Sequence, residues 1–179
     1  MINFKYEKKK IGILGGTFDP PHKGHLKISL SSIKRLKLNQ LFWIITKKNP
    51  LKEKSFFTLK ERIVKSREIT KKNKKIKIKY LEKTIRSSRT IDVLKHLNEK
   101  RNLDIYFIIG SDNLINFHKW RSWKKIIKLA KLTVFSREGF EKKAKNSPVI
   151  KYLKKDRIIY IKNNKIDISS SKLRKIYLR

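Results

Sequence analysis

One short stretch of the sequence concentrates residues that could do chemistry: Gly15 to His25, which reads GGTFDPPHKGH. It holds two of the four histidines and three of the six glycines of the chain. A glycine pair lets the backbone turn tightly and come close to a ligand. His22 and His25, three residues apart where a helix is predicted to begin, can share one face and converge on one phosphate near the helix N-terminus. We therefore predict that both imidazoles donate hydrogen bonds to phosphoryl oxygens in a phosphoryl or nucleotidyl transfer.

Other interpretations of this stretch are weaker. Isolated glycines and histidines would be ordinary loop and surface residues, but their concentration within eleven positions argues against that interpretation. The stretch is not a Walker A loop, because no G-K-[ST] follows, and it is not the G-x-G-x-x-G dinucleotide fingerprint. No third ligand accompanies the two histidines, so we predict no metal site in the protein itself.

A second candidate segment lies near the C-terminus, where Ile168 to Arg174 reads ISSSKLR. Its three hydroxyl groups can cap a helix and direct donors at an anion, and Lys172 and Arg174 add positive charge. Taken alone, the segment is equally typical of an ordinary helix N-cap followed by basic residues.

Six apolar runs rich in β-branched residues predict the strands that must position these segments. The runs are Ile11–Leu14, Leu41–Thr46, Ile76–Leu81, Ile105–Ile109, Leu132–Phe135 and Ile158–Ile161. Apolar residues at helical spacing lie between most of the runs, at Leu26, Leu30, Ile33 and Leu36, at Leu59, Ile63 and Val64, at Ile91, Leu94 and Leu97, and at Trp123, Ile126 and Ile127. This alternation predicts an α/β fold with a Rossmann-like, doubly wound, mainly parallel sheet and helices on both faces.

Ligands of such sheets bind at the carboxyl ends of the strands, at the topological switch point. We therefore expect the site where the first and fourth runs end, at Gly15-Gly16-Thr17 and Gly110-Ser111-Asp112. The polar stretch 138–156 has no clear period and contains Gly139 and Pro148. We expect it to be the most mobile internal segment.

The composition excludes several classes of protein. Cysteine is absent, which rules out disulfides, thiolate metal sites and a cysteine nucleophile. No apolar run approaches the roughly 18 residues that span a bilayer, and the first residues lack the apolar core of a signal peptide. We expect a cytoplasmic protein with no membrane partner.

The net charge of +35 is the most conspicuous feature of the composition. Such an excess suggests partners that carry phosphate, nucleic acid above all. However, 38 of the 49 basic residues are lysine, whereas specific nucleic-acid contacts favour arginine. The lysines are also spread along the chain together with many Ile and Asn, all of which have A/T-rich codons. We expect no specific nucleic-acid partner, and a basic nucleic-acid-binding protein is the alternative from another functional class.

Together, the two segments resemble the nucleotidylyltransferase superfamily, with its H-x-G-H signature and late S-S-[ST]-x-[IL]-R segment. The resemblance narrows to the nicotinate-nucleotide adenylyltransferases. Gly15–His25 is similar to that family's G-G-T-F-D-P-x-H-x-G-H. Gly110–Leu114, followed by Phe117, Trp120 and Trp123, is similar to its G-x-D-x-L…F…W…W block. Asn49–Lys52 resembles its P-P-H-K segment, and Thr90–Leu94 resembles its T-x-x-T-L helix start.

The resemblance implies that residues 1–179 form a single nucleotidyltransferase domain. The implied reaction joins nicotinate mononucleotide to ATP and yields nicotinate adenine dinucleotide and pyrophosphate, with Mg²⁺ accompanying the ATP. The phosphate of the mononucleotide would attack the α-phosphorus in line, without a covalent enzyme intermediate. Sister enzymes that act on nicotinamide mononucleotide or phosphopantetheine are the nearest alternative.

The resemblance also implies roles for individual residues. His22, His25 and Arg174 are the implied catalytic residues. Implied to bind ATP are Gly15, Gly16, Thr17, Phe18, Gly110, Asp112, Ser170 and Ser171. Implied to bind the nicotinate nucleotide are Trp120, Thr90, Lys52 and Arg137.

Trp120 is expected to stack on the nicotinate ring, since an indole face can cover a pyridine. The alternative for Trp120 is a core position, which we expect of Trp123. Three features depart from the family pattern: Leu51 where His is common, Val93 where a second Thr is common, and an end five residues after Arg174. We expect these departures to affect details of substrate contact and to leave the C-terminal cover trimmed or absent.

Overall fold

The computed structural model describes residues 7–48, 55–99, 102–153, 158–162, 170 and 173–174. In this part of the chain six strands form one sheet: β1 (Lys9–Gly16), β2 (Gln40–Ile45), β3 (Ile76–Lys79), β4 (Leu103–Gly110), β5 (Lys131–Phe135) and β6 (Ile158–Ile161). Their order is β3-β2-β1-β4-β5-β6, and every pairing is parallel. Each strand coincides with a predicted apolar run, so the prediction of a Rossmann-like parallel sheet is confirmed.

The strand order reverses between β1 and β4, which lie side by side at the centre of the sheet. Chain segments leave these two strands in opposite directions, toward β2 on one side and toward β5 on the other. Leu14 of β1 is level with Ile108 of β4, so the glycines that end the two strands, Gly16 and Gly110, lie next to each other. This is the switch point at which open α/β sheets bind ligands.

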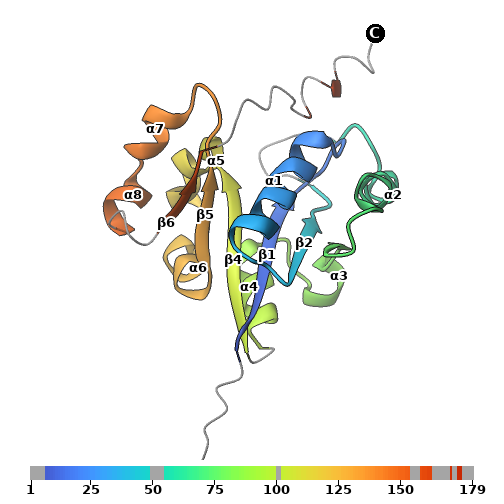
Figure 1. Cartoon of the computed structure of the whole chain (residues 1–179), viewed down its shortest axis with the longest axis horizontal. Helices are drawn as coiled ribbons and strands as arrows, with labels where there is room; N and C mark the ends of the chain where they lie inside the picture. Colours follow the sequence, from blue (N-terminus) through green and yellow to red (C-terminus); the bar gives the residue numbers. More distant parts are fainter. Residues whose placement is uncertain are drawn as a thin grey trace, which may run out of the picture.

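Helices cover both faces of the sheet (Figure 1). They are α1 (Lys23–Arg35), α2 (Leu59–Thr70), α3 (Glu82–Ile85), α4 (Thr90–Asn98), α5 (Ser111–Asn116), α6 (Trp123–Leu129), α7 (Glu141–Lys145) and α8 (Pro148–Leu153), with a 3-10 turn η1 (Phe117–Lys119). Two apolar cores result. One joins the sheet to α1 and α2, and the other joins it to α4, α5, α6, α7 and α8.

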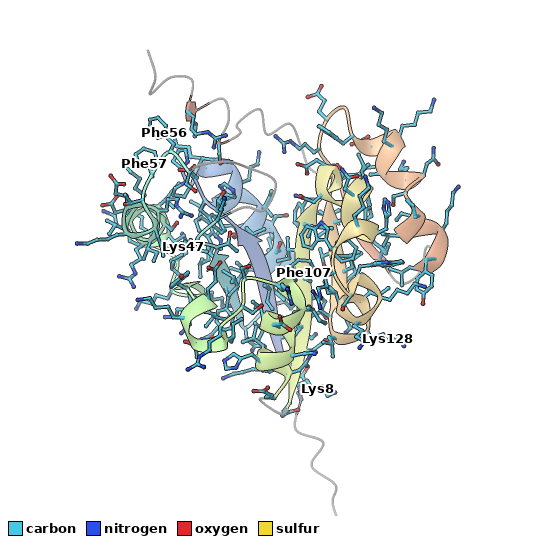
Figure 2. The ribbon with its side chains drawn as sticks, turned by 180° about the vertical axis from the view of Figure 1, so that it is seen from behind. Lys8, Lys47, Phe56, Phe57, Phe107 and Lys128 are labelled. Atoms are coloured by element: carbon cyan, nitrogen blue, oxygen red, sulfur yellow. The ribbon has the colours of Figure 1, made fainter. Side chains whose placement is uncertain are left out.

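The two ends of the sheet are distinct (Figure 2). Lys8, which precedes β1, marks the amino ends of the strands, and Phe56 and Phe57 lie at the opposite end of the molecule. Phe107 of β4 lies between them and is buried. The loop that follows β1 is therefore at the end of the molecule where Phe56 and Phe57 lie, since Asp19 of that loop binds both residues.

The most deeply buried residues of α1 are small ones, while Leu26, Ile28 and Ile33 pack against the core and stay partly buried. Gly24, Ser29 and Ser32 are buried, whereas Leu30, one of the residues that predicted the helix, is 41% exposed. The two serine hydroxyls donate to carbonyls one turn back, Ser29 to His25 and Ser32 to Ile28, both at 2.8 Å. Small residues bring the helix close to the sheet, and this close approach places its N-terminus against the end of β1.

The region 138–156 contains more regular structure than its sequence predicts. Helices α7 and α8 lie within it, and they bury Ala144, Val149 and Leu153 against the second core. The helices have five and six residues, too few for a period of 3.6 residues to be evident in the sequence. The expectation that this stretch is the most mobile internal segment concerns motion and stays a prediction.

A search of the described residues for a helix that is long and apolar enough to cross a membrane finds none.

Candidate active site

His22 and His25 meet at the junction between β1 and α1. His22 is the N-cap of α1, and its Nδ1 accepts a hydrogen bond from the backbone N–H of Gly24 at 3.1 Å. The backbone N–H of His22 in turn donates to Nδ1 of His25 at 3.2 Å. The centroids of the two imidazoles are 3.8 Å apart. The two histidines therefore cap the helix reciprocally and lie against each other, as their spacing predicts.

These hydrogen bonds fix the tautomer of both rings. A nitrogen that accepts a hydrogen bond from a backbone N–H carries no proton, so Nδ1 is unprotonated in each ring. A neutral imidazole then carries its proton on Nε2, and each ring keeps one N–H donor directed away from the helix cap. The site thus presents two neutral donors.

The surroundings of the pair keep both imidazoles neutral. Burial, and to a lesser extent the charge of Arg137, lowers the pKa of His22 to about 4. Burial, with smaller contributions from His22 and Arg137, lowers the pKa of His25 to about 3. Both values lie far below 7, so neither ring is an imidazolium near neutral pH.

Two aromatic rings, those of Phe18 and Trp43, pack against the ring of His25. The ring of Phe18 lies 4.8 Å from that of His25 and stacks on Trp43 at 4.7 Å between centroids. Trp43 is fully buried and donates through Nε1 to Ser29 at 2.7 Å. Phe18 adopts a left-handed backbone conformation with φ of +49°, which is unfavourable for a bulky residue. Burial of its ring offsets this strain and makes Phe18 a wall of the site.

The end of β4 adds a carboxylate that is paired with a guanidinium. Nη1 of Arg137 contacts Oδ2 of Asp112 at 2.7 Å, and the backbone N–H of Arg137 donates to the Ser111 hydroxyl at 2.9 Å. A Cβ atom at Gly110 would collide with Oδ1 of Asp112, so the glycine leaves room for the carboxylate in its present position. The sequence predicts Asp112 on the ATP side and Arg137 on the nicotinate side; in the structure the two residues are partners.

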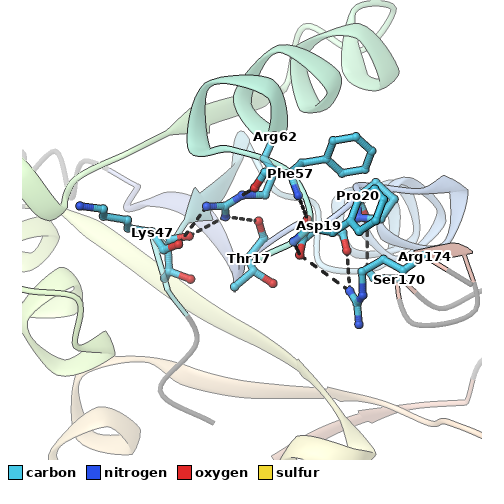
Figure 3. A network of polar contacts seen from close by, with 10 residues as sticks. Thr17, Asp19, Pro20, Lys47, Phe57, Arg62, Ser170 and Arg174 are labelled. Atoms are coloured by element: carbon cyan, nitrogen blue, oxygen red, sulfur yellow. Dashed lines mark hydrogen bonds and ion pairs between the residues drawn. The ribbon is translucent and has the colours of Figure 1, made fainter. Parts of the chain in front are cut away.

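Ser170 and Arg174, near the C-terminus, contact the loop between β1 and α1 (Figure 3). The Ser170 hydroxyl donates to the carbonyl of Pro20 at 3.0 Å, and Nη1 of Arg174 donates to the carbonyl of Asp19 at 2.6 Å. The same Nη1 lies 3.9 Å from Oδ2 of Asp19. The structure thus brings Ser170 and Arg174 to the loop that precedes His22. Ser171 and Lys52, two other predicted site residues, lie outside the described residues.

Two residues predicted to bind the nicotinate nucleotide, Trp120 and Thr90, lie on the face of the sheet that α4 to α8 cover. Trp120 follows η1 and packs at 5.2 Å from Phe117 and 6.1 Å from Phe107 between ring centroids. It is half-buried, which leaves part of its ring accessible. Thr90 begins α4 and is half-buried too. Trp123, predicted in the core, is also only half-buried and packs edge-on against Tyr152 at 5.0 Å.

Two residues that the sequence analysis assigned no role hold the loops of the site together. Asp19 is buried and accepts backbone N–H bonds from Phe56 and Phe57, both at 2.8 Å. Arg62 is 1% exposed and donates to backbone carbonyls of four residues: Phe57, Thr17, Thr46 and Lys47. Burial lowers the pKa of Arg62. No local signal marks Arg62, because it stands among charged residues of a helix and looks solvated in the sequence.

Comparisons with known proteins agree with this geometry. The family model described as Cytidylyltransferase-like matches residues 13–176. A Pelagibacter ubique protein named "Probable nicotinate-nucleotide adenylyltransferase" is 49% identical over 174 residues, which cover 97% of each chain. The chain belongs to the nicotinate-nucleotide adenylyltransferase family. A Rhizobium meliloti member with the same name is 35% identical over 83% of this chain and 79% of its own.

A solved member of the nicotinate-nucleotide adenylyltransferase family has the same fold. The Plasmodium falciparum nicotinic acid mononucleotide adenylyltransferase, complexed with NaAD, superposes with a TM-score of 0.74 at 25% identity. The match covers 93% of this chain and 83% of that one. The resemblance on which the sequence analysis depends is thereby confirmed at the level of family and fold.

Proposed function

We propose that this chain transfers the adenylyl group of ATP to nicotinate mononucleotide, giving nicotinate adenine dinucleotide and pyrophosphate. The observation that carries the proposal is the imidazole pair: two neutral Nε2–H donors side by side at the switch point of the sheet, in a chain 49% identical to a named member of the family. The proposal includes a single nucleotidyltransferase domain over residues 1–179 and a cytoplasmic location.

The donor nucleotide is held by the loop between β1 and α1. A Cβ atom at Gly15 would meet no atom of the described residues within 4 Å, so packing of the described residues does not require glycine there. Approach of a phosphate to the backbone of Gly15, Gly16 and Thr17 accounts for it. The Nε2–H groups of His22 and His25 then donate to phosphate oxygens around the α-phosphorus, where charge develops during transfer.

Neutral donors suit this step, because they stabilise the added charge without losing or gaining a proton. The mononucleotide phosphate forms a bond to the α-phosphorus as the bond to the bridging oxygen of pyrophosphate breaks, and that oxygen takes the electron pair. The phosphate nucleophile is already an anion near neutral pH. The reaction therefore needs no general base from the protein.

Ser170 and Arg174 hold the phosphates from the opposite side. In the structure they donate to the carbonyls of Pro20 and Asp19, which border the histidine loop. A guanidinium has five N–H donors, so Arg174 can keep the Asp19 carbonyl and also bind a phosphate. Ser171 belongs to the same proposed set.

The carboxylate of Asp112 binds the ribose hydroxyls of the adenosine. Arg137, its present partner, then turns toward the phosphates, because its charge already acts on both imidazoles. We therefore assign Arg137 to the donor side, and assign Trp120, Thr90 and Lys52 to the nicotinate nucleotide.

Magnesium enters with ATP as part of the substrate. The described residues contain no group of three or more His, Cys, Asp or Glu side chains placed to hold a metal ion. The carboxylates nearest the imidazoles are engaged, Asp112 by Arg137 and Asp19 by two backbone N–H groups. Mg²⁺ prefers substrate phosphates and waters to protein cages, and bound there it offsets the charge of the triphosphate.

The test is an assay of pyrophosphate release by the purified protein with ATP, Mg²⁺ and one acceptor at a time. We expect release with nicotinate mononucleotide, and less with nicotinamide mononucleotide or phosphopantetheine. Preference for another acceptor would assign the chain to a sister enzyme. Selective RNA binding without ATP turnover would replace the proposal with a nucleic-acid-binding role.

A further inference from the structure

Arg62 of α2 carries a charge in the interior of the protein without a role in the steps above. It is 1% exposed, and burying a charged group is costly unless its hydrogen-bonding capacity is filled. The guanidinium meets that requirement with backbone carbonyls: Nε donates to Phe57 at 3.1 Å, Nη1 to Thr17 at 2.6 Å and Thr46 at 2.8 Å, and Nη2 to Lys47 at 2.9 Å.

These carbonyls come from three separate segments of the chain (Figure 3). Thr17 follows β1, Thr46 and Lys47 follow β2, and Phe57 precedes α2. The planar fork of one guanidinium thus fixes the ends of two adjacent strands against the beginning of a helix. The shortest of the four bonds is to Thr17, whose backbone belongs to the proposed phosphate-binding loop.

Asp19 completes the arrangement from the other side. Its Oδ1 accepts the backbone N–H of Phe57 at 2.8 Å, while Arg62 binds the carbonyl of that same residue. Asp19 therefore binds the backbone N–H of Phe57, and the oppositely charged Arg62 binds its carbonyl. The loop that carries the imidazoles is tied down at Thr17 by Arg62 and at Asp19 by the 56–57 segment.

We propose that Arg62 is a positioning residue for adenylyl transfer, which holds the loop between Thr17 and His22 so that both imidazoles face the phosphates of ATP. The proposal rests on the proposed function. Misplacement of reacting groups by about 1 Å costs on the order of 10²-fold in rate. A loosened loop therefore lowers turnover more than it weakens binding of the acceptor nucleotide.

The test compares Arg62→Lys with wild type, using Arg67→Lys as the matched control on the exposed side of the same helix. A lysine ammonium keeps the buried charge but lacks the planar fork. We expect kcat to fall by about 10- to 100-fold and KM for nicotinate mononucleotide to change by less than about threefold. The control should behave as wild type.

Histidine NMR supplies a readout that general destabilisation would not reproduce. The chain has four histidines, so His96 and His118 act as internal references. We expect the ring signals of His22 and His25 to move in Arg62→Lys and the ring signals of the two references to stay. Should Arg62→Lys not fold, Asp19→Asn acts on the other backbone group of Phe57 and should move the same two histidines.

Unchanged kcat with unchanged His22 and His25 signals would overturn the positioning role. So would movement of all four histidines together with a large drop in Tm, because Arg62 would then serve stability alone. Failure of the proposed function would be seen elsewhere, as a lack of pyrophosphate release by the wild-type protein.

Discussion

The backbone N–H of His22 donates to Nδ1 of His25 at 3.2 Å, and the two imidazole centroids are 3.8 Å apart. One contact therefore both caps the helix and selects the tautomer of His25. The hydrogen bonds that start the helix also set the positions of the two rings, so the geometry of the imidazole pair is determined by the local fold.

Replacing His25 with alanine should remove one of the two donors. We expect His25→Ala to lower kcat by about 10²- to 10³-fold, the usual effect of losing a preorganised donor to the transition state. Steady-state kinetics of pyrophosphate release measures the effect. His96→Ala, at a half-buried position of α4 outside the proposed site, is the control and should retain wild-type turnover. Near-normal kcat in His25→Ala would remove this residue from the reaction.

The pH profile of kcat/KM distinguishes neutral imidazoles from imidazoliums. This parameter reports the pKa values of groups in the uncomplexed enzyme, and those of His22 and His25 are about 4 and about 3. We expect kcat/KM for ATP to stay level between about pH 7 and 8.5. A decline across this range with the midpoint of a histidine titration would show that a protonated ring is required.

Folding stability should fall in weak acid because of the same two groups. Unfolded histidines bind protons below about pH 6.5, whereas the folded pair resists protonation down to about pH 3–4. The unfolded state binds more protons in this window, so stability is complete above about pH 6.5 and decreases as the pH falls. Tm measured against pH should therefore decrease less in His25→Gln than in wild type. Parallel curves would contradict the depressed pKa of His25.

Arg137 should influence both imidazoles through its charge. We expect Arg137→Gln to raise the pKa of His22 and His25, because the charge of Arg137 lowers both, and to raise KM for ATP. NMR titration of the histidines and steady-state kinetics provide the two measurements. Arg121→Gln, at an exposed position, controls for net charge. Unchanged histidine titrations would place Arg137 away from the donor site.

Trp120 should act on the acceptor and not on ATP. Stacking of an aromatic side chain on a base contributes about 1–3 kcal/mol, so we expect Trp120→Leu to raise KM for nicotinate mononucleotide by about 10-fold or more. KM for ATP should stay near the wild-type value. Trp123→Leu, three residues further on, is the matched control. An equal effect of both substitutions on both substrates would mean that Trp120 serves only the core.

The strands could be predicted from the sequence because each is a short apolar run with β-branched residues, a pattern that needs no knowledge of distant contacts. The burial of Ser29 and Ser32 in α1 could not, because it depends on close packing and on the bond to Trp43. Helical spacing of apolar residues predicted the helix correctly, and Leu26, Ile33 and Leu36 pack against the core. Only Leu30 of this set is exposed.

The same distinction between local pattern and distant contacts applies to the residues of the candidate site. His22, His25 and Asp112 stand in contiguous motifs beside strand ends, so local pattern was sufficient to find them. Arg62 is buried and donates to backbone carbonyls of residues up to 45 positions away in the sequence. Its neighbours Lys60, Glu61 and Lys65 are charged, so the sequence alone suggests that Arg62 is exposed to solvent. Asp19 lay inside the recognised motif, but its partners in the 56–57 segment are visible only in three dimensions.

The most direct test of the central claim is a crystal structure of the wild-type protein with Mg²⁺ and a non-hydrolysable ATP analogue. We predict that Nε2 of His22 and Nε2 of His25 each lie about 3 Å from a phosphate oxygen, with both Nδ1 atoms still bound to the backbone. An analogue bound with its phosphates elsewhere, or imidazoles rotated away from them, would contradict the account.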